Sequence, residues 1–106
     1  MNKKIFVIDD EQDIQEIVKI NLKDDGYKVF CFSSAEEALK ELQNTVPGLI
    51  VLDIMMEGID GYEFCKQLKS APEYKDIPII FLSAKSDEFD KVLGLELGGD
   101  DYITKP

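Results

Sequence analysis

The chain of 106 residues is predicted to fold as one small α/β domain built on a parallel sheet. Short apolar runs alternate along the chain with segments whose apolar residues repeat at helical spacing. One run, residues 49–52, is almost wholly apolar, which is typical of a central strand covered on both faces. A composition of 44% hydrophobic and 32% charged residues allows a core and excludes a disordered or fibrous chain.

The first half of the chain predicts three strands and two helices. The strands are residues 5–8, 29–32 and 49–52, and the last of them leads directly into Asp53. The first helix carries an apolar stripe of Ile14, Ile17, Val18 and Leu22. It ends at Asp24-Asp25-Gly26, where the glycine suits a left-handed cap. Ser34 with Glu37 predicts a capping box for the second helix, which carries Ala35, Ala38, Leu39 and Leu42 and is stopped by Pro47-Gly48.

The second half predicts two helices and two strands after a loop at residues 57–61. The elements in order are a helix with Phe64, Cys65 and Leu68, a strand at 79–82, a helix capped by Ser86 that closes at Gly98-Gly99, and a short strand at 102–104. A doubly wound sheet needs helices on both faces, and the first helix would cover one face almost alone. We therefore expect residues 1–106 to be a domain truncated before its last helix.

Several classes of function are excluded by composition. The net charge is −10, which argues against direct binding of nucleic acid or of an anionic membrane. The chain has no histidine and two cysteines without C-x-x-C spacing, so zinc, haem and His-based catalysis lack their residues. The first apolar run stops at Asp9-Asp10, too early for a signal peptide or membrane span, and the free thiols suggest a cytoplasmic location.

Chemically active residues follow the predicted strands. Parallel strands would bring to one edge Asp9, Asp10, Asp53, Ser83 and Lys105. For a strand order of 2-1-3-4-5, ligands bind between strands one and three, and the acidic residues flank that point. Each acid alone is explained by capping of a helix N-terminus. Three converging carboxylates repel one another unless a cation lies among them, and a small set of hard oxygen ligands indicates Mg²⁺.

An aspartate, a metal, a hydroxyl and a lysine at one point are the parts of phosphoryl transfer to a carboxylate. No proton-transferring base is needed, because the carboxylate is already an anion at neutral pH. Alone, Ser83 would be read as a turn hydroxyl and Lys105 as a solvated cation. Their shared edge favours the functional interpretation.

These residues carry a resemblance to a known family over the whole chain. The motifs are Val7-Ile8-Asp9-Asp10-Glu11, Leu52-Asp53-Ile54-Met55-Met56 leading to Asp60-Gly61, Ser83-Ala84, and Asp100-Asp101-Tyr102-Ile103-Thr104-Lys105-Pro106. They resemble the receiver (CheY-like) domain of two-component response regulators. The resemblance implies a flavodoxin-like, doubly wound parallel sheet of five strands in the order 2-1-3-4-5, with the fifth helix absent from this chain.

The resemblance also implies the role of each residue at the acidic edge. Asp53 would accept a phosphoryl group from a sensor histidine kinase. Asp10, Asp53 and the backbone carbonyl of Met55 would bind Mg²⁺, with Asp9 acting largely through water. Ser83 and Lys105 would bind the phosphoryl oxygens. The domain would thus be a phosphoacceptor that assists its own phosphorylation and dephosphorylation rather than an enzyme.

Three further positions have implied or open roles. Ser83 and Tyr102 would move together on activation, although Tyr102 is equally explained as an amphipathic aromatic residue at a sheet edge. Members of the family often have proline where this chain has Glu57, which could contact the cation through water. Lys85 lies where the family varies its dephosphorylation rate.

The run from Lys91 to Glu96 followed by residues 99–102 most resembles receivers of the OmpR/PhoB group of transcription factors. Those receivers dimerise when phosphorylated, and the implied dimer face in this chain is Lys91, Glu96 and Asp101. The alternative is a solvated helix face, since exposed ion pairs contribute little alone.

Other uses of such a fold fit less well. A haloacid dehalogenase-like phosphatase needs an aspartate where this chain has Met55, and a flavodoxin needs a phosphate loop where Asp9-Asp10 would repel the anion. No P-loop motif is present. The alternative from another class is a receiver-like adaptor that acts by protein contact without phosphorylation.

Overall fold

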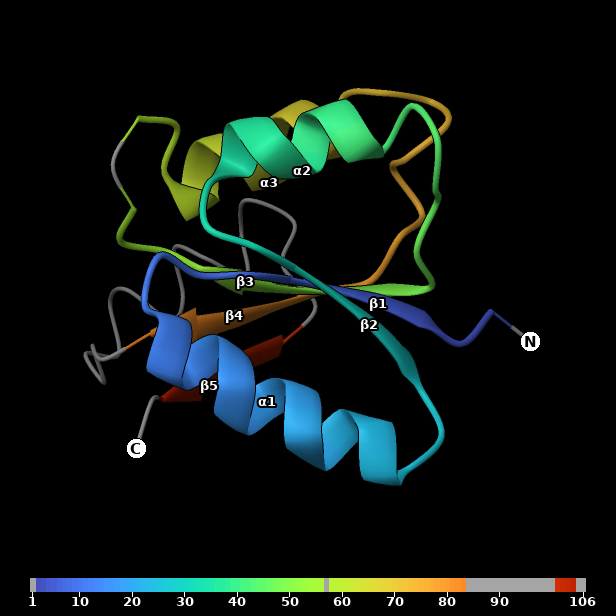
Figure 1. The fold of residues 1–106 in the computed structure, drawn as a ribbon. Coiled ribbons are helices and arrows are strands. Elements are labelled where there is room, and N and C mark those ends of the chain that lie inside the picture. Colours follow the sequence, from blue (N-terminus) through green and yellow to red (C-terminus); the bar gives the residue numbers. More distant parts are fainter. Residues whose placement is uncertain (1, 57, 84–100, 105–106) are drawn as a thin grey trace.

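The computed structural model describes residues 2–56, 58–83 and 101–104, and these form a five-stranded parallel sheet (Figure 1). The strand order is β2-β1-β3-β4-β5, which confirms the predicted order. The strands are β1 (Lys4–Ile8), β2 (Lys28–Phe32), β3 (Leu49–Asp53), β4 (Ile79–Ser83) and β5 (Asp101–Thr104). All four neighbouring pairs are parallel.

The described helices cover both faces of the sheet. They are α1 (Gln12–Asp24), α2 (Ala35–Glu41) and α3 (Gly61–Lys69). Helix α1 lies on one face, and α2 and α3 lie together on the other (Figure 1). Within the described ranges, no helix is long and apolar enough to cross a membrane. The fourth predicted helix, from Ser86 to Gly99, lies outside the described residues.

The main core fills the space between the sheet and helices α2 and α3. Alternate residues of β1, β3 and β4 point to this side, because successive side chains of a strand face opposite ways. Phe6, Phe64 and Phe81 are all fully buried there. The Phe6 ring also contacts Phe32 edge-on, with 4.8 Å between centroids.

The predicted turns are confirmed with small changes at helix ends. Gly26 has a φ of 90°, the left-handed conformation expected at the end of α1. Ser34 Oγ accepts from the Glu37 amide, but the Glu37 carboxylate bonds to the Ser33 amide, one residue before the cap. Helix α2 ends at Glu41, earlier than the predicted stop at Pro47.

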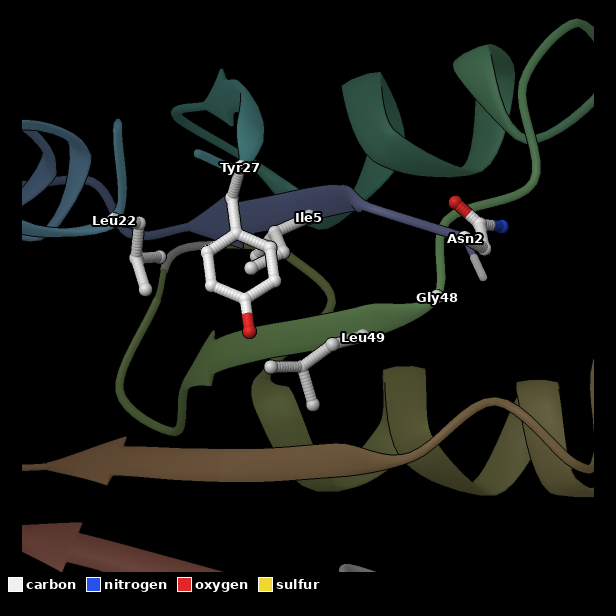
Figure 2. Close-up of a pocket in the computed structure, with 6 residues that line it drawn as sticks. All are labelled: Asn2, Ile5, Leu22, Tyr27, Gly48 and Leu49. Carbon is white, nitrogen blue, oxygen red and sulfur yellow. The ribbon is translucent and has the colours of Figure 1, made fainter. Parts of the chain in front are cut away.

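The face beneath α1 is only partly covered. No residue of α1 is buried, and Ile17, predicted to face the core, is 49% exposed. Beside α1 lies an apolar hollow of about 350 Å³ lined by Asn2, Ile5, Leu22, Tyr27, Gly48 and Leu49. Figure 2 shows the Tyr27 ring extending across this hollow toward Leu49.

We predict that a helix placed over this face would stabilise the domain. Apolar side chains contribute roughly 1.5–3 kcal/mol each when fully buried, against a total stability of about 5–15 kcal/mol. A version of the chain extended by a helix of about a dozen residues that packs on this face should unfold at a higher midpoint and show less concentration-dependent association. If both chains melt cooperatively as monomers at the same midpoint, this prediction is wrong.

Candidate functional site

The register of the sheet brings the carboxyl ends of its central strands to one level. Strand β1 pairs Ile8 with Leu52 of β3, so Asp9 and Asp53 follow at matching positions. Strand β3 in turn pairs Asp53 with Leu82 of β4, the residue before Ser83. The predicted residues of strands one, three and four therefore reach the same edge of the sheet.

Three carboxylates converge at this edge. One oxygen each from Asp9, Asp10 and Asp53 can be chosen so that all lie within 4.8 Å of one another. Asp9 is fully buried and Asp53 is 2% exposed, whereas Asp10 is exposed and open to solvent. The site therefore has a buried floor and an open side.

Backbone amides hold the two buried carboxylates in place. The Glu11 amide donates to Asp9 Oδ1 at 2.9 Å, and the Met55 amide donates to Asp53 Oδ1 at 3.3 Å. Both bonds turn the chain immediately after its strand, which fixes each carboxylate relative to the following loop.

The donor set fits a hard divalent cation. Like charges this close repel one another, and a cation among them removes that repulsion. Carboxylate oxygens with room for water are the ligands that Mg²⁺ takes. Asp10 and Asp53 could bind the ion directly, with Asp9 behind them.

The remaining predicted residues are placed only in part. Ser83 ends β4 and pairs with Thr104 of β5. Lys105 is the next residue in the sequence after Thr104. Tyr102 pairs with Phe81, and Asp101 is the first residue of β5. The predictions for Glu57, Lys85, Lys91, Glu96 and Lys105 lie outside the described residues.

Sequence reasoning missed Gln15. Its side-chain amide donates to the Asp9 carbonyl oxygen, to the Phe32 carbonyl oxygen at 3.2 Å and to Ser33 Oγ at 3.2 Å. Gln15 thus joins the ends of β1 and β2 next to the acidic site. A polar residue on a helix is usually solvated, so the sequence offers no signal for this contact.

The cysteines are not reactive thiols of this site. Cys65 belongs to α3 and is buried in the core. Burial raises the pKa of the Cys31 thiol, which keeps it protonated at neutral pH and therefore a weak nucleophile.

The sequence profile of the response regulator receiver domain matches residues 5–106. The chain belongs to the response regulator receiver family. The family predicted from the motifs at residues 7–11, 52–61, 83–84 and 100–106 is thereby confirmed.

Individual relatives agree with this membership. The chain is 54% identical over its full length to the alkaline phosphatase synthesis transcriptional regulatory protein PhoP of Bacillus subtilis, and it spans 43% of that protein's length. A putative response regulator from Chloroflexus aurantiacus superimposes with a TM-score of 0.94 at 34% identity, covering 100% of this chain and 87% of that one. The response regulator Rcp1, solved in an Mn²⁺-bound form, superimposes with a TM-score of 0.89 at 26% identity. The match covers 98% of this chain and 81% of that one.

Proposed function

We propose that Asp53 accepts a phosphoryl group from a sensor histidine kinase in a Mg²⁺-dependent reaction, and that this modification switches an output. The observation that carries the proposal is the convergence of Asp9, Asp10 and Asp53 within 4.8 Å at the end of the central strands. Asp53 is one of the two buried members of this group. Phosphorylation would convert this carboxylate into an acyl phosphate, which adds negative charge to the site, so a cation held by the neighbouring carboxylates would offset that charge.

In the proposed reaction, a carboxylate oxygen of Asp53 attacks the phosphorus of a phosphohistidine. The new oxygen–phosphorus bond forms as the nitrogen–phosphorus bond breaks, and the imidazole leaves with that electron pair. The attacking group in this step is a carboxylate anion, so the step requires no general base. The domain is thus proposed as a phosphoacceptor that assists its own modification and its reversal, and not as an enzyme.

Mg²⁺, when bound, would neutralise charge on the phosphoryl oxygens and on the carboxylates. Asp10, Asp53 and the Met55 carbonyl are proposed to hold it, with Asp9 contacting it through water. The Mn²⁺-bound form of Rcp1, a relative in fold and sequence, supports a divalent cation at this kind of domain.

Two residues are proposed to bind the phosphoryl oxygens. Ser83 ends the strand next to β3, and Lys105 follows the residue paired with Ser83. Ser83 and Tyr102 are proposed to move together once the phosphoryl group is bound.

The proposed output is regulation of transcription, supported by 54% identity to a transcriptional regulatory protein. The partners are a sensor histidine kinase and, after phosphorylation, a second copy through Lys91, Glu96 and Asp101. This acidic domain is not expected to contact nucleic acid itself, since its net charge is −10. The location proposed is cytoplasmic.

The function is tested by incubating the chain with a small acyl phosphate and Mg²⁺ and mapping the modified residue by mass spectrometry. We expect one phosphoryl group on Asp53 and none in the presence of a chelator. Equal labelling with chelator, or labelling elsewhere, contradicts the proposal. No labelling under any condition favours the adaptor that acts without phosphorylation.

Mg²⁺ is also expected to stabilise the fold. A ligand that binds only the native state at ten times its Kd contributes roughly 1.4 kcal/mol. Thermal melts of the wild-type chain should therefore show a higher midpoint with Mg²⁺, and the rise should shrink in Asp10→Asn. An equal rise in both proteins, or none in the wild type, argues against a metal site at Asp10.

A further inference from the structure

The loop between β3 and α3 is contacted by a carboxylate from another helix. Glu36, in the first turn of α2, accepts a hydrogen bond through Oε2 from the Ile59 amide at 3.3 Å. The same oxygen lies so close to Gly58 that a Cβ there would be only 2.6 Å from it. Gly58 also has a φ of 76°, a conformation that other residues rarely adopt. The carboxylate therefore packs directly on the backbone of residues 58 and 59.

This loop is the one that begins at the proposed acceptor. At its start the Met55 amide bonds to Asp53 Oδ1, and at its end the Gly61 amide donates to the Ile54 carbonyl oxygen at 3.0 Å. The two ends are thus tied to the end of β3. Glu36 contacts Gly58 and Ile59, between these two ends, which fixes a third point of the loop.

Helix α2 offers a rigid base for this contact. Ala35 and Ala38 on its inner side are fully buried in the core. The neighbouring Glu37 carboxylate bonds to the Ser33 amide, which anchors the start of the helix. Figure 1 shows the β3–α3 loop passing beside the N-terminal end of α2.

The simpler interpretation of Glu36 is an acidic residue that favours a helix N-terminus. Glu37 satisfies that interpretation, because its bonds are to Ser33 and Ser34 at the start of its own helix. Glu36 instead reaches a residue 23 positions away, on a different element. A tertiary contact of this kind constrains the loop rather than the helix.

We infer that Glu36 is a positioning residue, which holds the β3–α3 loop so that the Met55 carbonyl meets the cation beside Asp53. This inference rests on the proposed function, because it assigns Glu36 a part in the Mg²⁺ site of the acceptor. Glu36 touches neither the cation nor the phosphoryl group and acts through its contacts with the backbone of residues 58 and 59.

The first measurement uses the metal-free protein. Amide hydrogen exchange followed by NMR should show faster exchange at Ile59 in Glu36→Ala than in the wild type, because its acceptor is lost. The matched control is Glu37→Gln, which removes the same charge one residue away and leaves the loop contact intact. Glu36→Gln keeps an acceptor oxygen and should lie near the wild type.

The second measurement is the Kd for Mg²⁺, from shifts of the loop amides during titration. Outer-shell partners of metal sites usually change affinity by about 10–100-fold, and for this indirect, solvent-accessible contact we expect roughly threefold to tenfold weaker binding in Glu36→Ala. Glu37→Gln and Glu36→Gln should both stay close to the wild-type Kd.

A third arm tests the contact with Gly58. Gly58→Ala should weaken Mg²⁺ binding, since its Cβ meets the Glu36 carboxylate, and the loss should be smaller when Glu36→Ala is also present. Contacting residues give such non-additive effects, whereas distant residues give additive ones. Strictly additive losses argue against the contact.

The outcomes separate the inference from the function on which it rests. A wild type that binds Mg²⁺ while Glu36→Ala shows unchanged Ile59 exchange and unchanged Kd overturns the inference alone. A wild type that binds no Mg²⁺ overturns the proposed function and the inference with it. If Glu36→Ala and Glu37→Gln weaken Mg²⁺ binding equally, the effect is due to the lost charge, and the positioning role of Glu36 is overturned.

Discussion

Asp53→Asn is expected to abolish phosphorylation of the chain by a small acyl phosphate. The amide has nearly the shape of the carboxylate, but it lacks the negative charge that makes the oxygen a nucleophile. Asp53 is 2% exposed and lies among two other carboxylates, so removing its charge also relieves repulsion in the metal-free protein. The thermal midpoint without Mg²⁺ should therefore be equal to or higher than that of the wild type.

The control for this result is Asp13→Asn. Asp13 lies in the first turn of α1 and is exposed, so the substitution makes the same change of charge outside the acidic site. We expect wild-type labelling in this variant and slowed labelling in Asp10→Asn. Labelling of Asp53→Asn at the wild-type rate contradicts the assignment of Asp53 as acceptor. If the thermal midpoint of Asp53→Asn is instead lowered, a loss of labelling in that variant is explained by unfolding.

The site was predictable from sequence where it depends on strand ends. Asp9 and Asp53 follow apolar runs, and a parallel sheet must bring such ends to one edge. Gly26 was predictable for a similar local reason, because it follows the last helical residues and has the conformation that glycine tolerates best.

The contacts that support the site could not be predicted from sequence. Gln15 and Glu36 both occur on helices where a polar residue is ordinarily solvated, and each bonds to backbone many residues away. Their partners are fixed only when the helices pack against the sheet. For Ile17 the sequence prediction was wrong in the other direction. Helical spacing predicts that it is buried, but its side chain is half exposed in the fold.

Gly61 was recognised only as part of a motif, and the structure gives a physical reason for it. It is the first residue of α3, and it is buried against the end of β3. A Cβ at this position would meet the Asp53 carbonyl oxygen and lie 2.8 Å from the Ile54 Cα. These atoms are backbone, so they cannot turn aside as the end of a flexible side chain can.

Gly61→Ala is therefore expected to destabilise the domain and to slow phosphorylation together. Overpacking of a close contact costs about 1–3 kcal/mol, and the higher helix propensity of alanine offsets at most about 1 kcal/mol of it. Helix α3 is held by the buried Phe64 and Leu68, so part of the shift must fall on the backbone of Asp53. A net loss of 1 kcal/mol lowers the midpoint of a domain of this size by roughly 4–8 °C.

The matched control is Gly26→Ala. Gly26 follows the C-terminal end of α1, whereas the acidic site lies at the N-terminal end of that helix. The φ of 90° at Gly26 makes alanine unfavourable by about 1–2 kcal/mol, but a Cβ there meets nothing within 4 Å. Gly26→Ala should thus lower the midpoint by a similar amount and leave the labelling rate of the folded protein unchanged. Labelling is measured well below both midpoints, so that unfolding does not contribute. If Gly61→Ala labels at the wild-type rate under these conditions, the contact between α3 and the acceptor backbone is not what positions Asp53.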